Sequence, residues 1–209
     1  RTKAGITGTM ADAESARGAQ AAQGAKRARG KGETRRRLTR AAAEEFNAHG
    51  FAGTDTNKIA RRAGFAPQTF YRWFKDKTDI FLAVYRDWEE AEREMFAGLA
   101  AQKAPSLKLA EAVISHHRNY LLFRRSLRQL AVEDEAVRAA RAESRLRQLS
   151  RAAGPGASKS RLAELAVLLL QIERLCDGVA EGEFADLGLG EKEAKKTLGA
   201  LFEELRRQP

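Results

Sequence analysis

The sequence contains little of what stabilises a secreted or membrane-spanning protein. Cys176 is the only cysteine among 209 residues, so no disulfide can form within the chain, and we expect its thiol to pack in a core. The longest strictly apolar run, residues 165–170, is far shorter than the roughly 20 residues that a helix needs to cross a bilayer. The first 30 residues lack the apolar segment of a secretion signal. We therefore expect a protein of the reducing cytoplasm with no membrane partner.

Acidic residues are scarce in the N-terminal third. Residues 1–77 hold 17 Lys and Arg but only 7 Asp and Glu, whereas residues 78–209 hold 21 of each. The whole formal net charge of +10 thus lies before residue 78. This division indicates a module that binds a polyanion, joined to a neutral module. A solvated basic tail would account for residues 1–33 but not for the charges that follow.

Strand patterns are absent, and glycines and prolines fall between segments of helical periodicity. We predict an all-α fold of about nine helices, and the boundaries of eight are visible in the pattern: residues 34–49, 55–64, 67–74, 76–100, 106–126, 134–152, 158–181 and 191–207. Asp76 and Asp79 have the spacing of a capping box. Before the first helix, residues 1–31 have almost nothing to bury and are expected to form a disordered basic arm.

The stretch AGFAPQTFYRWFKDK, residues 63–77, follows a helix and a glycine turn, which is the spacing of a helix-turn-helix over residues 55–74. Phe70 and Phe74 share one helical face and should anchor the helix in the core. The opposite face, at the helix N-terminus, should enter the major groove of DNA. Gln68 is a residue type that pairs with base edges, and the Tyr71 hydroxyl suits a phosphate. The predicted DNA contacts are Thr54, Asn57, Lys58, Pro67, Gln68, Thr69, Tyr71, Arg72, Trp73, Lys75 and Lys77.

Residues 34–82 resemble the DNA-binding domain of the tetracycline-repressor (TetR) family of bacterial transcription regulators. The matching features are AAAEEFNAHGF, the pattern T-x-x-x-x-I-A from Thr54 to Ala60, and AGFAPQTFYRWFKDK followed by IFLAV. Thr56 stands where the family has an apolar residue, and Ala66 replaces a serine cap, which could cost about 1 kcal/mol of helix stability. The resemblance implies a DNA-binding domain over residues 32–92 and a ligand-binding and dimerisation domain over residues 93–209.

The resemblance also implies a repressor that binds a palindromic operator in double-stranded DNA as a homodimer and responds to a small-molecule effector. We predict a largely apolar effector cavity lined by Trp88, Phe96, His116, His117, Tyr120 and Phe123. The last two helices should form the dimer interface, with Leu165, Leu168, Leu169, Ile172, Leu198 and Leu201 as candidates.

Three interpretations of the histidine pair stay open. His116 and His117 can be structural, can line the cavity, or can bind a metal. The last needs distant ligands, because adjacent residues on a helix point about 100° apart. The five arginines between residues 138 and 151 are expected to form a solvated face rather than a second nucleic-acid surface.

An enzyme is the competing class of protein. The sequence has no Cys–His pair at a plausible spacing, no glycine-rich phosphate loop after a strand and no converging acidic cluster. We therefore predict neither catalysis nor a metal or cofactor. The alternative function is non-specific, architectural DNA binding, which would lack a sequence preference at physiological salt.

The basic arm generates a first prediction. Replacing Lys26, Arg27, Arg29 and Lys31 by alanine should reduce the slope of log affinity against log salt concentration by up to about four, because each cation displaces a counterion from a phosphate. Deleting residues 1–25, which carry few charges, serves as the control and should change the slope little. DNA titrations at several salt concentrations measure both, and an unchanged slope in the fourfold variant would show that the arm does not contact DNA.

Overall fold

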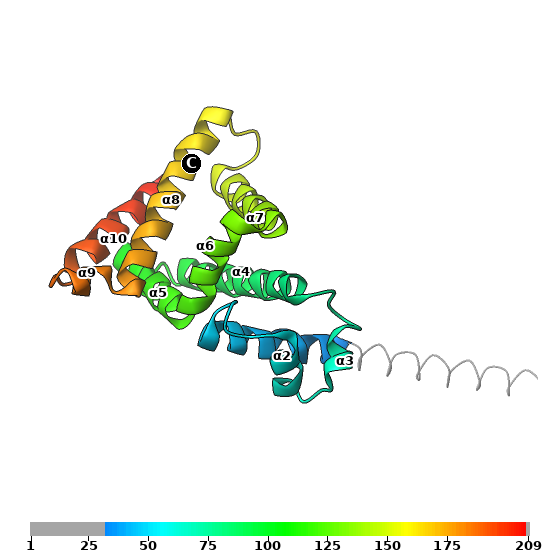
Figure 1. Ribbon diagram of the computed structural model, residues 1–209. Coiled ribbons are helices and arrows are strands. Elements are labelled where there is room, and N and C mark those ends of the chain that lie inside the picture. Colours follow the sequence, from blue (N-terminus) through cyan, green and yellow to red (C-terminus); the bar gives the residue numbers. More distant parts are fainter. Residues whose placement is uncertain (1–31, 208–209) are drawn as a thin grey trace, which may run out of the picture.

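A computed structural model describes residues 32–207 of the chain, and over this range it contains helices and no strand (Figure 1). The prediction of an all-α fold is confirmed. The predicted basic arm, residues 1–31, lies outside the described residues. The helices span residues 32–49, Thr56–Arg62 (α2), Pro67–Phe70 (α3), Lys77–Ala101 (α4), Ser106–Asn119 (α5), Leu121–Glu133 (α6), Glu135–Ala153 (α7), Lys159–Glu181 (α8), Glu183–Asp186 (α9) and Lys192–Arg207 (α10).

Local signals set the boundaries of the N-terminal helices. The Asp55 carboxylate caps α2 by accepting a hydrogen bond from the Lys58 amide at 2.8 Å. At the start of α4 the Asp76 carboxylate accepts from the Asp79 amide at 2.9 Å, and the Asp79 carboxylate accepts from the Lys75 amide at 3.0 Å. The predicted capping pair at α4 is thus confirmed.

Two predicted boundaries are wrong. The helix expected over residues 67–74 is α-helical only to Phe70 and continues as a turn, with Ala66 providing no side-chain cap. The single helix expected over residues 106–126 is two helices, which meet at Tyr120 with φ −122° and ψ 30°. There the Asn119 carbonyl accepts a hydrogen bond from the Asn47 side chain, a partner 72 residues away that helical periodicity does not reveal. The short helix α9 was also not predicted.

Two apolar clusters form the interior, and α4 reaches both. The first cluster joins the helix of residues 32–49, α2 and α3 to the first half of α4 and to α6. The second joins α5, α8 and α10, with Met95, Phe96 and Leu99 from the second half of α4 packed against it. In Figure 1, α2 and α3 lie below α4, while α7, α8 and α10 lie above it.

A buried ionic cluster connects α5, α6 and α8. The Asp177 carboxylate on α8 accepts from Arg124 Nε at 2.8 Å, lies 2.9 Å from His117 Nδ1 and lies 2.6 Å from Arg128 Nη1. Burial alone would raise the pKa of Asp177, but the hydrogen bonds from His117 and Arg124 outweigh it and hold that pKa below its ordinary value. Arg124, His117 and Asp177 are all nearly inaccessible to solvent, so the pairing compensates charges that water cannot reach.

This cluster predicts a large loss of stability on Asp177→Asn. The variant should lower the free energy of unfolding by about 3 kcal/mol, the low end for breaking a buried pair, because Arg124 keeps a longer contact with Glu173. Urea unfolding followed by circular dichroism measures the change.

The matched control is Glu183→Gln, which breaks an exposed ion pair with Arg174 and should cost no more than about 1 kcal/mol. Equal losses in Asp177→Asn and Glu183→Gln would contradict a special role for the buried cluster.

Candidate functional site

The turn between α2 and α3 is built by one glycine. Gly64 has φ +76°, its amide donates to the Arg61 carbonyl, and the Phe65 amide donates to the Ala60 carbonyl, both at 2.9 Å. This pair of bonds is the Schellman ending of a helix, which requires the left-handed backbone that glycine adopts without strain. The Arg37 guanidinium supports the turn from the first helix by donating to the Ala63 carbonyl at 2.7 Å.

The α3 segment presents a polar face above two buried rings. Phe70 and Phe74 are almost completely buried in the first cluster, where their rings lie 5.7 Å apart. Gln68, Tyr71 and Arg72 are exposed, whereas Pro67, Thr69 and Trp73 are partly buried. The arrangement leaves the beginning of α3 free to approach a groove of DNA.

The Tyr71 hydroxyl has a partner within the protein. It lies 3.0 Å from the hydroxyl of Thr56 at the start of α2. Thr56 stands where the family that the sequence resembles has an apolar residue. Its hydroxyl contact with Tyr71 gives the threonine a structural role at this position. It orients the Tyr71 ring, which is 60% exposed, on the outer side of the helix-turn-helix.

Two of the predicted DNA contacts, Thr54 and Lys77, form hydrogen bonds with other residues of the protein. Thr54 is buried, and its hydroxyl donates to the Glu45 carboxylate at 2.7 Å. The Lys77 ammonium donates to the carbonyls of Phe51 and Thr54 at 2.8 and 3.0 Å, and burial lowers its pKa. Neither side chain is therefore available to a phosphate.

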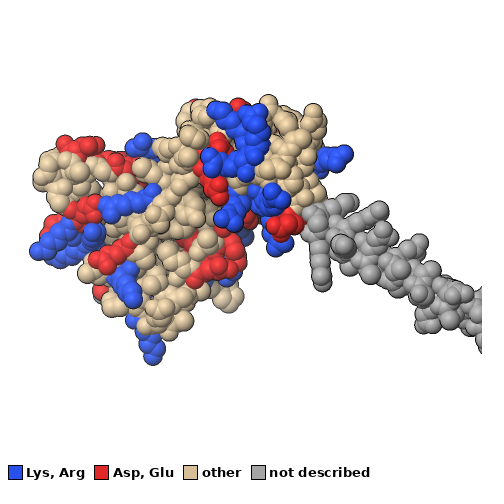
Figure 2. Space-filling view, turned by 90° about the horizontal axis from the view of Figure 1, so that it is seen from below, with Lys and Arg blue, Asp and Glu red and all other residues tan. Residues whose placement is uncertain are grey.

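The remaining candidates lie on a basic surface. Asn57, Lys58 and Lys75 are exposed, as is Arg72. Figure 2 shows the molecule from below, the side on which α2 and α3 lie, and Lys and Arg predominate over the N-terminal helices while both signs mix elsewhere. Such a surface suits the phosphate backbone.

A cavity of about 720 Å³ lies between α4, α7 and α8, with side chains of α5, α6 and α10 completing its wall. The predicted residues Trp88, Phe96 and His117 are among those that line it. His116 and Tyr120 instead pack behind Trp88, since the His116 ring stacks on the Trp88 ring at 5.3 Å and packs at a tilt against the Tyr120 ring at 5.0 Å. Phe123 is buried against Phe81 in the first cluster.

Most of the surface that lines the cavity is apolar, in agreement with the prediction, but its wall also carries ionic side chains that were not predicted. Glu173 pairs with Arg141 at 2.7 Å, with Arg124 at 3.4 Å and with Arg145. Glu89 contacts Ser144 and lies 3.3 Å from Arg147. The solvated face expected of the α7 arginines is thus wrong for Arg141 and Arg145, which turn toward α8.

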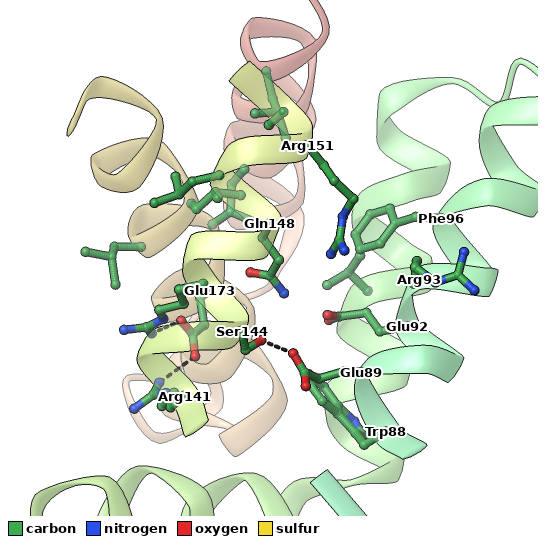
Figure 3. Close-up of a pocket in the computed structure, with 18 of the residues that line it drawn as sticks. Trp88, Glu89, Glu92, Arg93, Phe96, Arg141, Ser144, Gln148, Arg151 and Glu173 are labelled. Atoms are coloured by element: carbon green, nitrogen blue, oxygen red, sulfur yellow. Dashed lines mark hydrogen bonds and ion pairs between the residues drawn. The ribbon is translucent and has the colours of Figure 1, made fainter. Parts of the chain in front are cut away.

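Glu92 is the exception among the cavity acids. Figure 3 shows its carboxylate projecting from α4 into the space opposite Gln148 of α7. It makes no hydrogen bond or ion pair with any described residue, and burial raises its pKa to about 7, although Arg124 favours the charged form. One signal of this position was present in the sequence, since Glu92 lies midway between Trp88 and Phe96 at helical spacing.

Neither histidine belongs to a metal site within residues 32–207, where no three His, Cys, Asp or Glu side chains gather in a way that could hold an ion. Burial lowers the pKa of His116 to about 4, so the stacked ring is neutral at pH 7. None of the described helices has the length and apolar character to cross a bilayer.

The predicted dimer contacts largely face their own protomer. Leu165, Leu168, Ile172 and Leu198 are buried in it, Leu169 lines the cavity, and Leu201 packs against the second cluster. Helical periodicity identified these residues as apolar but could not decide which apolar face points inward. Val167 on α8 is 57% exposed, whereas Leu170, which is 48% exposed, lies where α8 borders the cavity.

Comparison with known proteins gives matches at two scales. Residues 38–84 match the model of the family described as bacterial regulatory proteins, tetR family. The uncharacterized HTH-type transcriptional regulator YdgC of Bacillus subtilis (strain 168) is 36% identical over 67 residues, which are 32% of this chain and 34% of that protein. The chain therefore aligns with about a third of this relative. A crystal structure assigned to a TetR-family transcriptional regulator from Rhodococcus sp. has a TM-score of 0.61 at 19% identity, covering 83% of this chain and 98% of that one, which shows a shared fold.

The unpaired carboxylate predicts a pH-dependent gain in stability on Glu92→Gln. Between the ordinary pKa of 4.5 and the raised pKa of about 7, the folded protein keeps a proton that the unfolded chain has lost, so stability falls as pH rises through this window. The glutamine variant lacks this loss. Its thermal midpoint should exceed that of the unaltered protein by about 2–4 °C or more at pH 8, and by less at pH 5.

Scanning calorimetry at both pH values measures the difference. Glu94→Gln makes the same change at an exposed position of α4 and should leave the midpoint unaltered. A gain for Glu92→Gln that is equal at pH 5 and pH 8 would show that the carboxylate is not destabilised by burial.

Proposed function

We propose that this chain, which belongs to the TetR family of bacterial regulatory proteins, is a sequence-specific regulator of transcription that binds operator DNA. The observation that carries the proposal is the exposed face of α3, with Gln68, Tyr71 and Arg72 held outward by the buried rings of Phe70 and Phe74. The domain of residues 32–92 supplies this surface, and the excess of Lys and Arg before residue 78 supports phosphate contacts.

A homodimer follows from the geometry of such recognition. Two α3 segments about 34 Å apart reach successive major grooves, so a dimer binds a palindromic operator. The exposed Val167 on α8 supports an interface formed by the domain of residues 93–209. The adjacent α10, which packs on α8, would complete a bundle of four helices.

The cavity supports regulation by a small molecule. Its volume lies in the range of ligand pockets, and α4 leads directly from the end of the helix-turn-helix at Lys77 to Trp88 and Phe96 on the cavity wall. A ligand that shifts α4 would change the distance between the two α3 segments and release both half-sites. We infer a ligand-responsive repressor that works in the cytoplasm.

Non-specific, architectural DNA binding is the second candidate, and the basic N-terminal third favours it. The two functions differ in sequence preference. DNA fragments selected by the purified protein from a random pool at physiological salt should share a palindromic sequence if the proposal holds. A pool without a shared sequence would favour the architectural function.

The α3 surface predicts different effects for two substitutions. Gln68→Ala should relax the preference at particular base pairs by about 1–3 kcal/mol, because a base-edge contact is lost. Tyr71→Phe should weaken binding to all sequences by a similar factor, because a phosphate contact carries no sequence information. Fluorescence anisotropy with the selected operator and single-base variants of it measures both.

Two controls separate DNA contact from internal effects. Thr56→Val removes the internal partner of the Tyr71 hydroxyl but leaves that hydroxyl in place, so it should weaken binding less than Tyr71→Phe does. Gln102→Ala, at an exposed position at the end of α4, should leave the base preference unchanged. If Gln68→Ala and Tyr71→Phe both bound like the unaltered protein, α3 would not be the segment in the groove.

A further inference from the structure

The acidic groups of the cavity differ in whether they have partners. Three arginines surround Glu173, and Glu89 contacts Ser144 and Arg147. Glu92 has neither a hydrogen bond nor an ion pair among the described residues, although its carboxylate faces the cavity (Figure 3). Glu92 is partly buried, and the hydration that its carboxylate loses there is costly unless a partner compensates it. The Glu92 carboxylate therefore has room for an ionic or hydrogen-bonding partner, which a bound ligand could provide.

The basic groups of the cavity are mostly compensated. Arg124 pairs with Asp177 and Glu173, and Glu173 also holds Arg141 and Arg145. Arg93 is turned to Glu90 on the outer side of α4. Arg151, the remaining arginine of the wall, is exposed to solvent, which can hydrate its charge. Arginines therefore outnumber acids on the cavity wall, but among the acids only the Glu92 carboxylate has no charge partner among the described residues while it faces the interior.

The surroundings of Glu92 suit an apolar body that carries the compensating charge. Phe96 lies one helical turn from Glu92 on the same face of α4, and its ring packs 6.1 Å from that of Phe202. Apolar side chains complete this part of the wall: Leu149, Leu169, Ile172 and Leu205. An aromatic ring beside a carboxylate stabilises an ammonium group through the ring's negative face.

We propose that the cavity binds an organic cation, in which a protonated amine on an aromatic or aliphatic body pairs with the Glu92 carboxylate. The proposal rests on the proposed function, in which this cavity is the effector site. The amine supplies both the positive charge and the hydrogen-bond donors that Glu92 lacks, and the apolar body fills the space along Phe96. Of the arginines on the wall that could attract an anion, Arg124, Arg141 and Arg145 are already held by Glu173 and Asp177.

Three probes with one ring system test the proposal: 2-(1-naphthyl)ethylamine, 2-(1-naphthyl)ethanol and 1-naphthaleneacetate. They are respectively cationic, neutral and anionic at pH 8, where Glu92 is ionised. Isothermal titration calorimetry with the full chain should show that the amine binds at least about tenfold more tightly than the alcohol or the acid, which corresponds to roughly 1.4 kcal/mol.

Substitution on α4 assigns the effect to one carboxylate. Glu92→Gln should weaken binding of the amine about tenfold and change binding of the alcohol less than about twofold, because only the amine makes an ionic contact. Glu94→Gln, an exposed position on the same helix, should affect neither probe. Tighter binding of the acid, an unchanged amine affinity in Glu92→Gln, or no binding of the amine would each overturn the proposal.

Operator binding by the unaltered protein without any probe is measured separately. Loss of the proposed function would appear as a failure to select a DNA sequence, whatever the probes do. Failure of the cation proposal would appear in calorimetry while operator binding persists. The two outcomes can therefore be told apart.

Discussion

The buried pair of Arg124 and Asp177 is the interaction on which the arrangement of the two halves depends. Arg124 lies on α6, whose neighbouring residues reach into the N-terminal domain: Phe123 packs 5.0 Å from Phe81, and Ser126 accepts a hydrogen bond from the Phe51 amide at 2.9 Å. Asp177 lies on α8, which belongs to the second apolar cluster. A charge pair that water cannot reach fixes its geometry more narrowly than apolar contact does, because any displacement leaves a charge uncompensated. It therefore sets where α6, and with it the N-terminal domain, stands on the rest of the chain.

This placement gives the cavity two connections to the helix-turn-helix. The first is α4, which lines the cavity at its centre and begins beside the Lys75 and Lys77 segment. The second is α6, because Arg124 lines the cavity while Ser126 and Phe123, on the same helix, hold the chain around Phe51. A change of charge next to Glu92 can act on both helices, since Glu92 lies on α4 and the Arg124 guanidinium on α6 partly offsets the rise that burial causes in the pKa of Glu92. Coupling between the sites can therefore pass through either helix, or through both together.

Features that depend on residues close together in the sequence could be predicted, whereas features that depend on partners far apart in the sequence could not. The Asp76 cap, the Gly64 turn and the Phe70–Phe74 anchor depend on residues within a few positions, and each was predicted from that local pattern. The break at Tyr120 and the polarity of the cavity depend on partners 72 and 53 residues away, Asn119 with Asn47 and Arg124 with Asp177. Helical periodicity identifies the apolar face of a helix, but it does not identify the helix against which that face packs. For that reason the sequence did not reveal that Leu165 and Leu198 are buried within their own protomer, and it did not single out Glu92.

Glu92 shows how stability and function oppose one another in this cavity. A glutamine at this position would keep the shape of the side chain and remove the cost of a buried charge, so folding alone does not account for the carboxylate. The other acids on the cavity wall, Glu89 and Glu173, each have a hydrogen-bonding or ionic partner. The fold can therefore supply a partner to a carboxylate at this wall. Residues that are unfavourable for folding stability are expected at binding sites. The cost of this carboxylate is also a source of binding free energy, because a cation that neutralises it relieves the folded protein of an unfavourable charge. A ligand of this class therefore stabilises the state in which Glu92 is ionised and faces the cavity, and it does so through α4, the helix that reaches the DNA-binding surface.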